Sequence, residues 1–78
     1  MIVKLTGVLE KRESDHLLVQ VGGLTYMVLV PYTVYSRVEE HVQDGRVELF
    51  LYDYIEVQQN RSFYMMIGFL NELEREFF

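Results

Sequence analysis

A glycine pair between two apolar runs constrains the fold of this chain more than any other feature. In the stretch V-G-G-L-T-Y-M-V-L-V-P, Gly22 and Gly23 provide the positive backbone angles that a two-residue hairpin turn needs. Residues 17–21 alternate between two faces before the turn, and residues 24–30 form a second strand-like run after it. Pro31 lacks a backbone N–H and ends this second strand. The sequence therefore predicts an antiparallel β-hairpin.

Two more strands are predicted from the residues that flank this hairpin on both sides. Residues 2–9 are rich in β-branched and apolar types, and Gly7 in their middle indicates a bulge or a sharp bend. Residues 10–15 are charged and predict a turn. A long strand is expected over residues 46–57, followed by a polar tip at residues 58–61.

The fifth strand is expected over residues 63–70, which are apolar on both faces. Residues 32–42 predict a short helix or an irregular connection, and Asp44-Gly45 is a turn signal. Five strands with a connection between the third and the fourth predict a mainly β fold, a five-stranded OB-fold barrel. A five-stranded SH3-like barrel is the alternative.

Length and composition limit the classes of site that the chain can hold. A domain of 78 residues has a marginal core and often gains stability from disulfides, metals or partner subunits. The absence of cysteine excludes disulfides and thiolate metal sites and is compatible with a reducing cytoplasm. His16 and His41 lie far apart in sequence and are expected to be exposed surface residues. No apolar run reaches the ~20 residues of a membrane span, so we expect a cytoplasmic protein without a membrane partner.

Charge and motif content argue against an enzyme and against a main DNA-gripping surface. Seven basic and twelve acidic residues give a net charge of −5, whereas proteins that neutralise phosphates usually carry a basic stripe. The glycine pair is a turn and not a phosphate-binding loop, and the serines have no histidine and acid at recognisable spacing. We expect no catalysis and no cofactor.

The doubly apolar fourth and fifth strands predict a contact with another subunit or domain. One face of these strands fills the barrel, and large exposed apolar patches usually mark contacts. Aromatic rings can also stack on bases, but few basic residues lie between them here. The candidate interface residues are Tyr52, Tyr54, Tyr64 and Met66.

Three motifs in order carry a resemblance to a known family. They are M-I-x-x-L-x-G-x-L at the start, V-G-G-x-x-Y-x-V-x-x-P in the hairpin, and I-G-F-x-x-x-x-E-R at residues 67–75. Together they resemble the N-terminal domain of RuvA, the junction-binding subunit of the bacterial branch-migration complex. The resemblance implies an OB-fold domain that assembles into a tetramer, holds a four-way DNA junction and works with RuvB motors. In the family an acidic Arg-Glu-Asp turn between the fourth and fifth strands repels phosphates at the crossover.

The sequence departs from the family at this turn, which is called the pin. It reads Glu56-Val57-Gln58 where Arg-Glu-Asp is expected, and residues 59–62 look like an insertion of about four residues. The candidate junction-facing residues are therefore Asp53, Glu56, Gln58 and Arg61, and the longer tip is less acidic.

The end of the chain is expected to begin a helix. Asn71 is a good N-cap with Glu74 three residues on, as in a capping box. The predicted division is a barrel over residues 1–70 and, over residues 71–78, the start of a helix that leads to a missing downstream domain. Because the helix-hairpin-helix part of the family is absent from these residues, junction binding by this chain alone is expected to be weak.

Two hypotheses for the function follow. The first is a RuvA-type N-terminal domain, a tetramerising and junction-shaping module that meets a RuvB-like motor through the missing domains. The alternative is a stand-alone OB module that binds single-stranded nucleic acid or a protein partner. Tight, salt-sensitive binding of single strands would favour the alternative.

Overall fold

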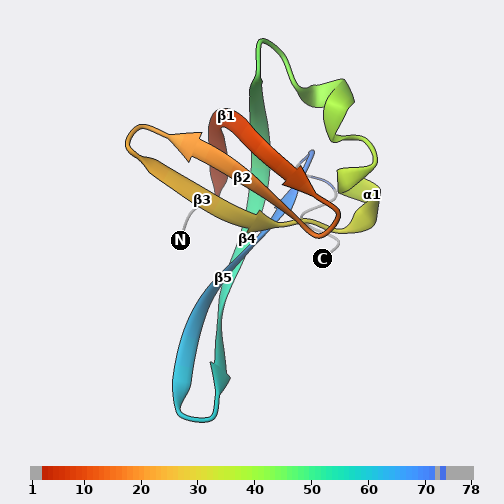
Figure 1. Ribbon diagram of the computed structural model, residues 1–78. Helices are drawn as coiled ribbons and strands as arrows, with labels where there is room; N and C mark the ends of the chain where they lie inside the picture. Colours follow the sequence, from red (N-terminus) through yellow and green to blue (C-terminus); the bar gives the residue numbers. More distant parts are fainter. Residues whose placement is uncertain (1–2, 72, 74–78) are drawn as a thin grey trace.

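A computed structural model describes residues 3–71 and 73, and these form a closed five-stranded β-barrel with one long projection (Figure 1). The strands are β1 (Lys4–Glu13), β2 (His16–Val21), β3 (Leu24–Leu29), β4 (Arg46–Gln58) and β5 (Arg61–Phe69). Their order around the barrel is β1-β2-β3-β5-β4, and β1 closes it by pairing with both β2 and β4. This confirms the predicted mainly β, five-stranded OB-type barrel.

The barrel closes because β1 changes partners along its length. Residues 4–8 pair with β4 and residues 8–13 pair with β2, both antiparallel. The predicted bend at Gly7 is instead a close approach, since a Cβ there would lie 2.3 Å from the carbonyl oxygen of Gln20. The regular pairing of β1 with β2 is instead interrupted between Leu9 and Lys11, where the register shifts. Beyond it β1 continues through residues that were predicted as a charged turn.

The connection between β3 and β4 plugs the barrel with two short helical segments, α1 (Tyr32–Tyr35) and η1 (Val38–His41). Pro31 takes the N-cap position of α1 with φ −65°, and its carbonyl accepts the N–H of Val34 at 3.0 Å. Val34 and Val38 are each only 1% exposed, because both pack into the core. An ion pair between Arg12 and Glu39 joins the end of β1 to η1.

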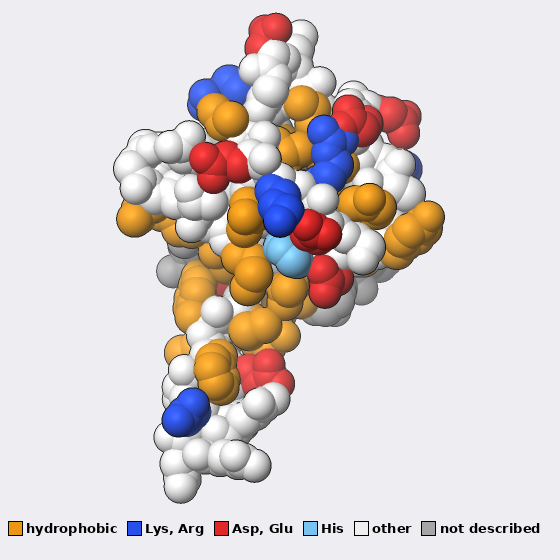
Figure 2. Space-filling view, viewed as in Figure 1, with side chains coloured by type: hydrophobic (Ala, Val, Ile, Leu, Met, Phe, Trp, Pro, Cys, Tyr) orange, Lys and Arg blue, Asp and Glu red, His pale blue; other side chains and the backbone are white. Residues whose placement is uncertain are grey.

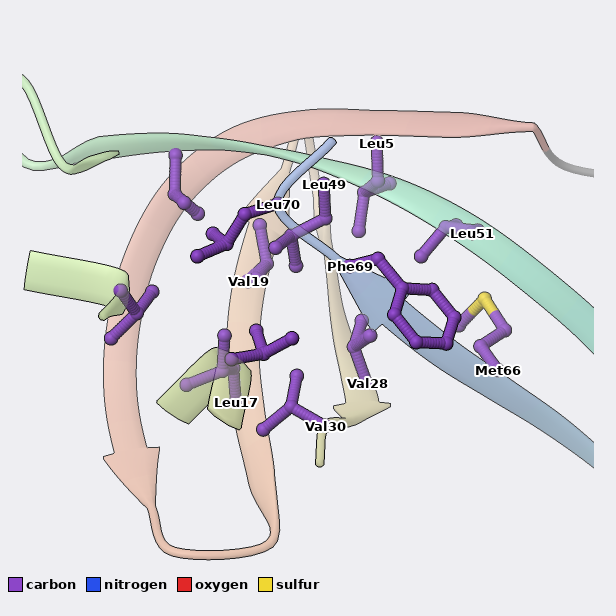
Figure 3. Packing of buried hydrophobic residues seen from close by; sticks show 13 residues of the cluster. Leu5, Leu17, Val19, Val28, Val30, Leu49, Leu51, Met66, Phe69 and Leu70 are labelled. Atoms are coloured by element: carbon purple, nitrogen blue, oxygen red, sulfur yellow. The ribbon is translucent and has the colours of Figure 1, made fainter. Parts of the chain in front are cut away.

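The core consists of inward-facing apolar side chains from every strand and from the connection between β3 and β4 (Figure 3). Val47, Leu49 and Leu51 of β4 are at most 2% exposed, as their alternation predicted. No polar or charged side chain is buried among residues 3–71 and 73. The full cluster is Leu5, Leu17, Val19, Val28, Val30, Val34, Val38, Val47, Leu49, Leu51, Met66, Phe69 and Leu70.

The predicted C-terminal helix lies outside the described residues, apart from Asn71 and Leu73, which are both exposed.

Candidate subunit and nucleic-acid interface

The most distinctive part of the molecule is a two-stranded ribbon that β4 and β5 form beyond the barrel (Figure 1). The last contact of β5 with β3 is the pair Leu29–Ile67, and β1 reaches no further along β4 than Phe50. From Asp53 to Met66 the two strands therefore pair only with each other. Six residues of β4 beyond this point span about 20 Å. We call residues 53–66 the ribbon.

A tight turn closes the ribbon at its tip. Gln58 pairs with Arg61, so only Gln59 and Asn60 lie between the strands. Both have positive φ, 46° and 66°, as the two central residues of a type I′ turn require. Asparagine tolerates this left-handed conformation better than most residues. The four-residue polar tip predicted from the sequence is thus a two-residue turn, and Arg61 and Ser62 belong to the paired part of β5.

Cross-strand partners assign each ribbon residue to one of two faces, because partners in register point to the same side. Tyr52 and Tyr54 lie on the face that continues the outside of the barrel, with ring centroids 6.2 Å apart. Tyr64 and Met66 lie on the opposite face, which continues the barrel interior. Met66 is only 7% exposed and packs into the core, so it is removed from the candidate interface.

The outer face of the ribbon joins an apolar strip on the barrel (Figure 2). The register pairs that connect it are Leu18–Met27, Leu29–Ile67, Tyr52–Ile67 and Tyr54–Met65. Met27 is 55% exposed, Tyr52 46% and Phe63 43%. We call this surface the outer apolar face; its members are Leu18, Met27, Leu29, Tyr52, Tyr54, Phe63, Met65 and Ile67.

Of the predicted interface residues, Tyr52 and Tyr54 belong to this surface, whereas Tyr64 lies on the opposite face. The prediction missed Phe63, Met65 and Ile67 on β5 and the part on β2 and β3. The alternation along residues 17–21 and 24–30 carried the signal, because Leu18, Met27 and Leu29 fall between the inward-facing residues. Exposed Ile55 and Val57, on the opposite face of the ribbon, were also missed.

Three of the four candidate pin residues gather near the tip. Glu56, Gln58 and Arg61 share the outer face of the ribbon, and the Gln58 side-chain amide donates a hydrogen bond to Glu56 Oε1 at 2.7 Å. Gln58, Gln59, Arg61 and Phe63 line a hollow there. Asp53 does not join them, because it lies on the opposite face about five residues nearer the barrel.

Asp53 instead accepts a hydrogen bond from the Tyr64 hydroxyl, diagonally across the ribbon. This bond, together with partial desolvation and the negative charge of Asp53, raises the pKa of Tyr64 above its ordinary value of 10.0. The folded ribbon therefore favours neutral Tyr64. The stabilisation that neutral Tyr64 provides is complete below pH 10 and is lost as the pH rises through the pKa of Tyr64 in the folded chain.

Replacing Asp53 with alanine is expected to lower the pKa of Tyr64 toward 10.0, because the acceptor and its charge both disappear. A ¹³C NMR titration of the tyrosine ring carbons measures this directly. Asp15→Ala is the matched control, since that carboxylate contacts His16 and not Tyr64. An unchanged Tyr64 titration in Asp53→Ala would contradict the hydrogen bond.

The two histidines form no common site. His41 is exposed as expected, whereas His16 is half-buried and its Nδ1 lies 2.8 Å from Asp15 Oδ1. Across residues 3–71 and 73, no three His, Asp or Glu side chains group as a metal site would require. Within the same residues, no helix is long and apolar enough to span a membrane.

Comparison with known proteins relates the sequence of this chain to a protein family. The sequence model of the family described as "RuvA N terminal domain" matches residues 1–61, which end at the ribbon tip. The chain is 31% identical over 78 residues to the Holliday junction branch migration complex subunit RuvA of Pelobacter propionicus, covering 100% of this chain and 36% of that protein. The subunit of the same name from Saccharophagus degradans is 30% identical, with 100% and 35% covered. That of Fusobacterium nucleatum is 28% identical, with 100% and 37% covered. The chain thus spans about a third of the length of these curated relatives.

Proposed function

The chain belongs to the RuvA N-terminal domain family, and on that basis we propose that it is a non-catalytic, cytoplasmic module that self-associates and shapes a four-way DNA junction. Its relatives are named as subunits of the Holliday junction branch migration complex. The role that we transfer from them is branch migration in DNA recombination and repair, with a RuvB-like motor acting on the same junction.

The observation that supports self-association is the outer apolar face. An isolated two-stranded ribbon is marginally stable in water, and large exposed apolar patches usually mark contacts. Tyr52 and Phe63 are each more than two-fifths exposed although they continue an apolar strip of the barrel. A second copy of the chain is enough to cover such a surface, so no different protein is needed as a partner. We propose that this face is a subunit interface within a homotetramer, the assembly implied by the family resemblance.

The proposal for DNA rests on the shape of the ribbon and on family membership. The ribbon projects from the barrel, and the longest dimension of the molecule is 41 Å (Figure 1). In a closed ring of subunits each copy contributes one ribbon. We propose that these ribbons meet the DNA at the crossover, whereas the acidic barrels stay away from the phosphates.

Two measurements on the 78-residue chain test this function. Sedimentation velocity over a concentration series is expected to show a reversible shift from monomer to a closed oligomer. Fluorescence anisotropy is expected to show weak binding that favours a four-way junction over a linear duplex with the same arm sequence. A strict monomer at high concentration would contradict the proposed assembly. Tight, salt-sensitive binding of single strands would instead favour the alternative of a free-standing OB module.

A further inference from the structure

The distal part of the ribbon differs in charge from the rest of the chain. All twelve acidic residues lie outside residues 57–65, and the only charged side chain within this segment is Arg61. No carboxylate in the described part of the chain forms an ion pair with Arg61. The tip is therefore an uncompensated positive charge on a molecule whose net charge is −5.

The other tip side chains are hydrogen-bonding groups. Gln58, Gln59 and Asn60 carry amides, and each amide offers two donors and one acceptor oxygen. The tight turn holds Gln59 and Asn60 at the extreme end of the ribbon, and all three amide residues are exposed. The nearest ribbon carboxylate, Glu56, already accepts a hydrogen bond from Gln58 at 2.7 Å.

These groups suit nucleic acid better than another acidic surface. Arginine binds phosphates and the O6 and N7 atoms of guanine, and glutamine and asparagine bind the N6 and N7 atoms of adenine. A two-stranded β-ribbon also fits the dimensions of the major groove. Because the chain as a whole is acidic, we expect a DNA strand to be attracted most strongly at the end of the ribbon.

We propose that the tip, residues 58–61, makes attractive contacts with DNA, with Arg61 on a phosphate and the amides of Gln59 and Asn60 on base edges. This inference rests on the proposed function, since it assigns a contact to the ribbon of a junction-shaping module. In this proposal, hydrogen bonding by a neutral-to-basic tip takes the place of the phosphate repulsion that the family resemblance implies for an acidic turn.

NMR of the ¹⁵N-labelled chain tests the contact at about 1 mM protein, above the ~10⁻⁴ M dissociation constants of weak non-specific DNA binding. The probes are a synthetic four-way junction, a linear duplex and a single strand. The side-chain signals of Gln59, Asn60 and Arg61 are expected to shift most, and most strongly with the junction. Arg61→Ala is expected to weaken junction binding several-fold and to reduce the salt slope by about 0.9, the value for one lost phosphate contact.

Arg46→Ala is the matched control. Arg46 is an exposed arginine at the opposite end of β4, twelve residues from Gln58, and its loss is expected to leave the affinity and the salt slope unchanged. Equal effects of the two substitutions would overturn the assignment of Arg61, because they would report only the total charge.

Three further results would overturn the tip contact, and each can be told apart from a failure of the proposed function. Shifts confined to the barrel would mean that the junction binds elsewhere, so the tip contact fails and junction binding stands. Tip signals that move with protein concentration alone would assign the tip to a second copy of the chain. No shift with any of the three DNAs would exclude the contact, and sedimentation would still report on self-association. Equal tip shifts with duplex and junction would instead support the contact and contradict the junction-specific role.

Discussion

Replacing Gly7 with alanine is expected to destabilise the barrel by about 3 kcal/mol or more, a large part of the roughly 4–12 kcal/mol typical of a domain of this size. A Cβ at this position would lie 2.3 Å from the carbonyl oxygen of Gln20 and 2.8 Å from Val21 Cγ2. The first of these atoms belongs to the backbone of β2, so no side-chain rotation relieves the contact. Because Gly7 lies where β1 passes from β4 to β2, the two strands must separate at the point where the barrel closes.

Urea unfolding followed by circular dichroism measures this effect, with both variants at the same protein concentration because self-association adds to apparent stability. Of the two glycines predicted to take positive φ in the hairpin turn, only Gly22 does so, at 61°. Gly23→Ala is therefore the matched control, since nothing lies within 4 Å of the Gly23 Cβ position and its φ is not in the left-handed region. That substitution is expected to change stability by no more than about 0.5 kcal/mol. Equal midpoints for the two variants would contradict the close approach of β1 and β2.

The prediction of β1 shows where sequence patterns stop being informative. Local composition indicated a turn over residues 10–15, because charged residues are depleted in strands. In the structure Lys11, Arg12 and Glu13 pair with β2 and stay in the strand, since their side chains are exposed or half-buried. Lys11 and Glu13 also form an ion pair at 3.3 Å. Strand pairing here overrides a composition that by itself indicates a turn.

The ribbon shows the same limit at the candidate site. The two strands that form it were predicted, but their extension beyond the barrel was not, and residues that are apolar on both faces do not reveal which face is buried. Met66 was consequently assigned to an interface, although its register partner Asp53 lies on the face that continues the barrel interior. The polar tip was located at residues 58–61, but its tightening to a two-residue turn was not predicted, because glutamine at positive φ, as at Gln59, is uncommon. Only the pairing register supplies both facts.

Replacing Met27 with glutamate is expected to weaken self-association by about 100-fold or more, which corresponds to roughly 2.7 kcal/mol. Met27 is 55% exposed on the outer apolar face, so the monomer tolerates a charge there. In the proposed oligomer the same carboxylate enters an apolar contact without a partner, and burying an unpaired charge is costly. Sedimentation equilibrium at matched concentrations gives the association constant, and circular dichroism shows that the barrel is intact.

Leu24→Glu is the control that separates this contact from general hydrophobicity. Leu24 is 62% exposed and belongs to the same strand, but it stands three residues from Met27 and therefore on the other face of β3. Its replacement adds the same charge to the chain and is expected to leave the association constant unchanged. If Leu24→Glu dissociates the oligomer and Met27→Glu does not, the subunits meet through the opposite face. If neither does, the outer apolar face is not where copies of the chain meet, and the ribbon needs another partner.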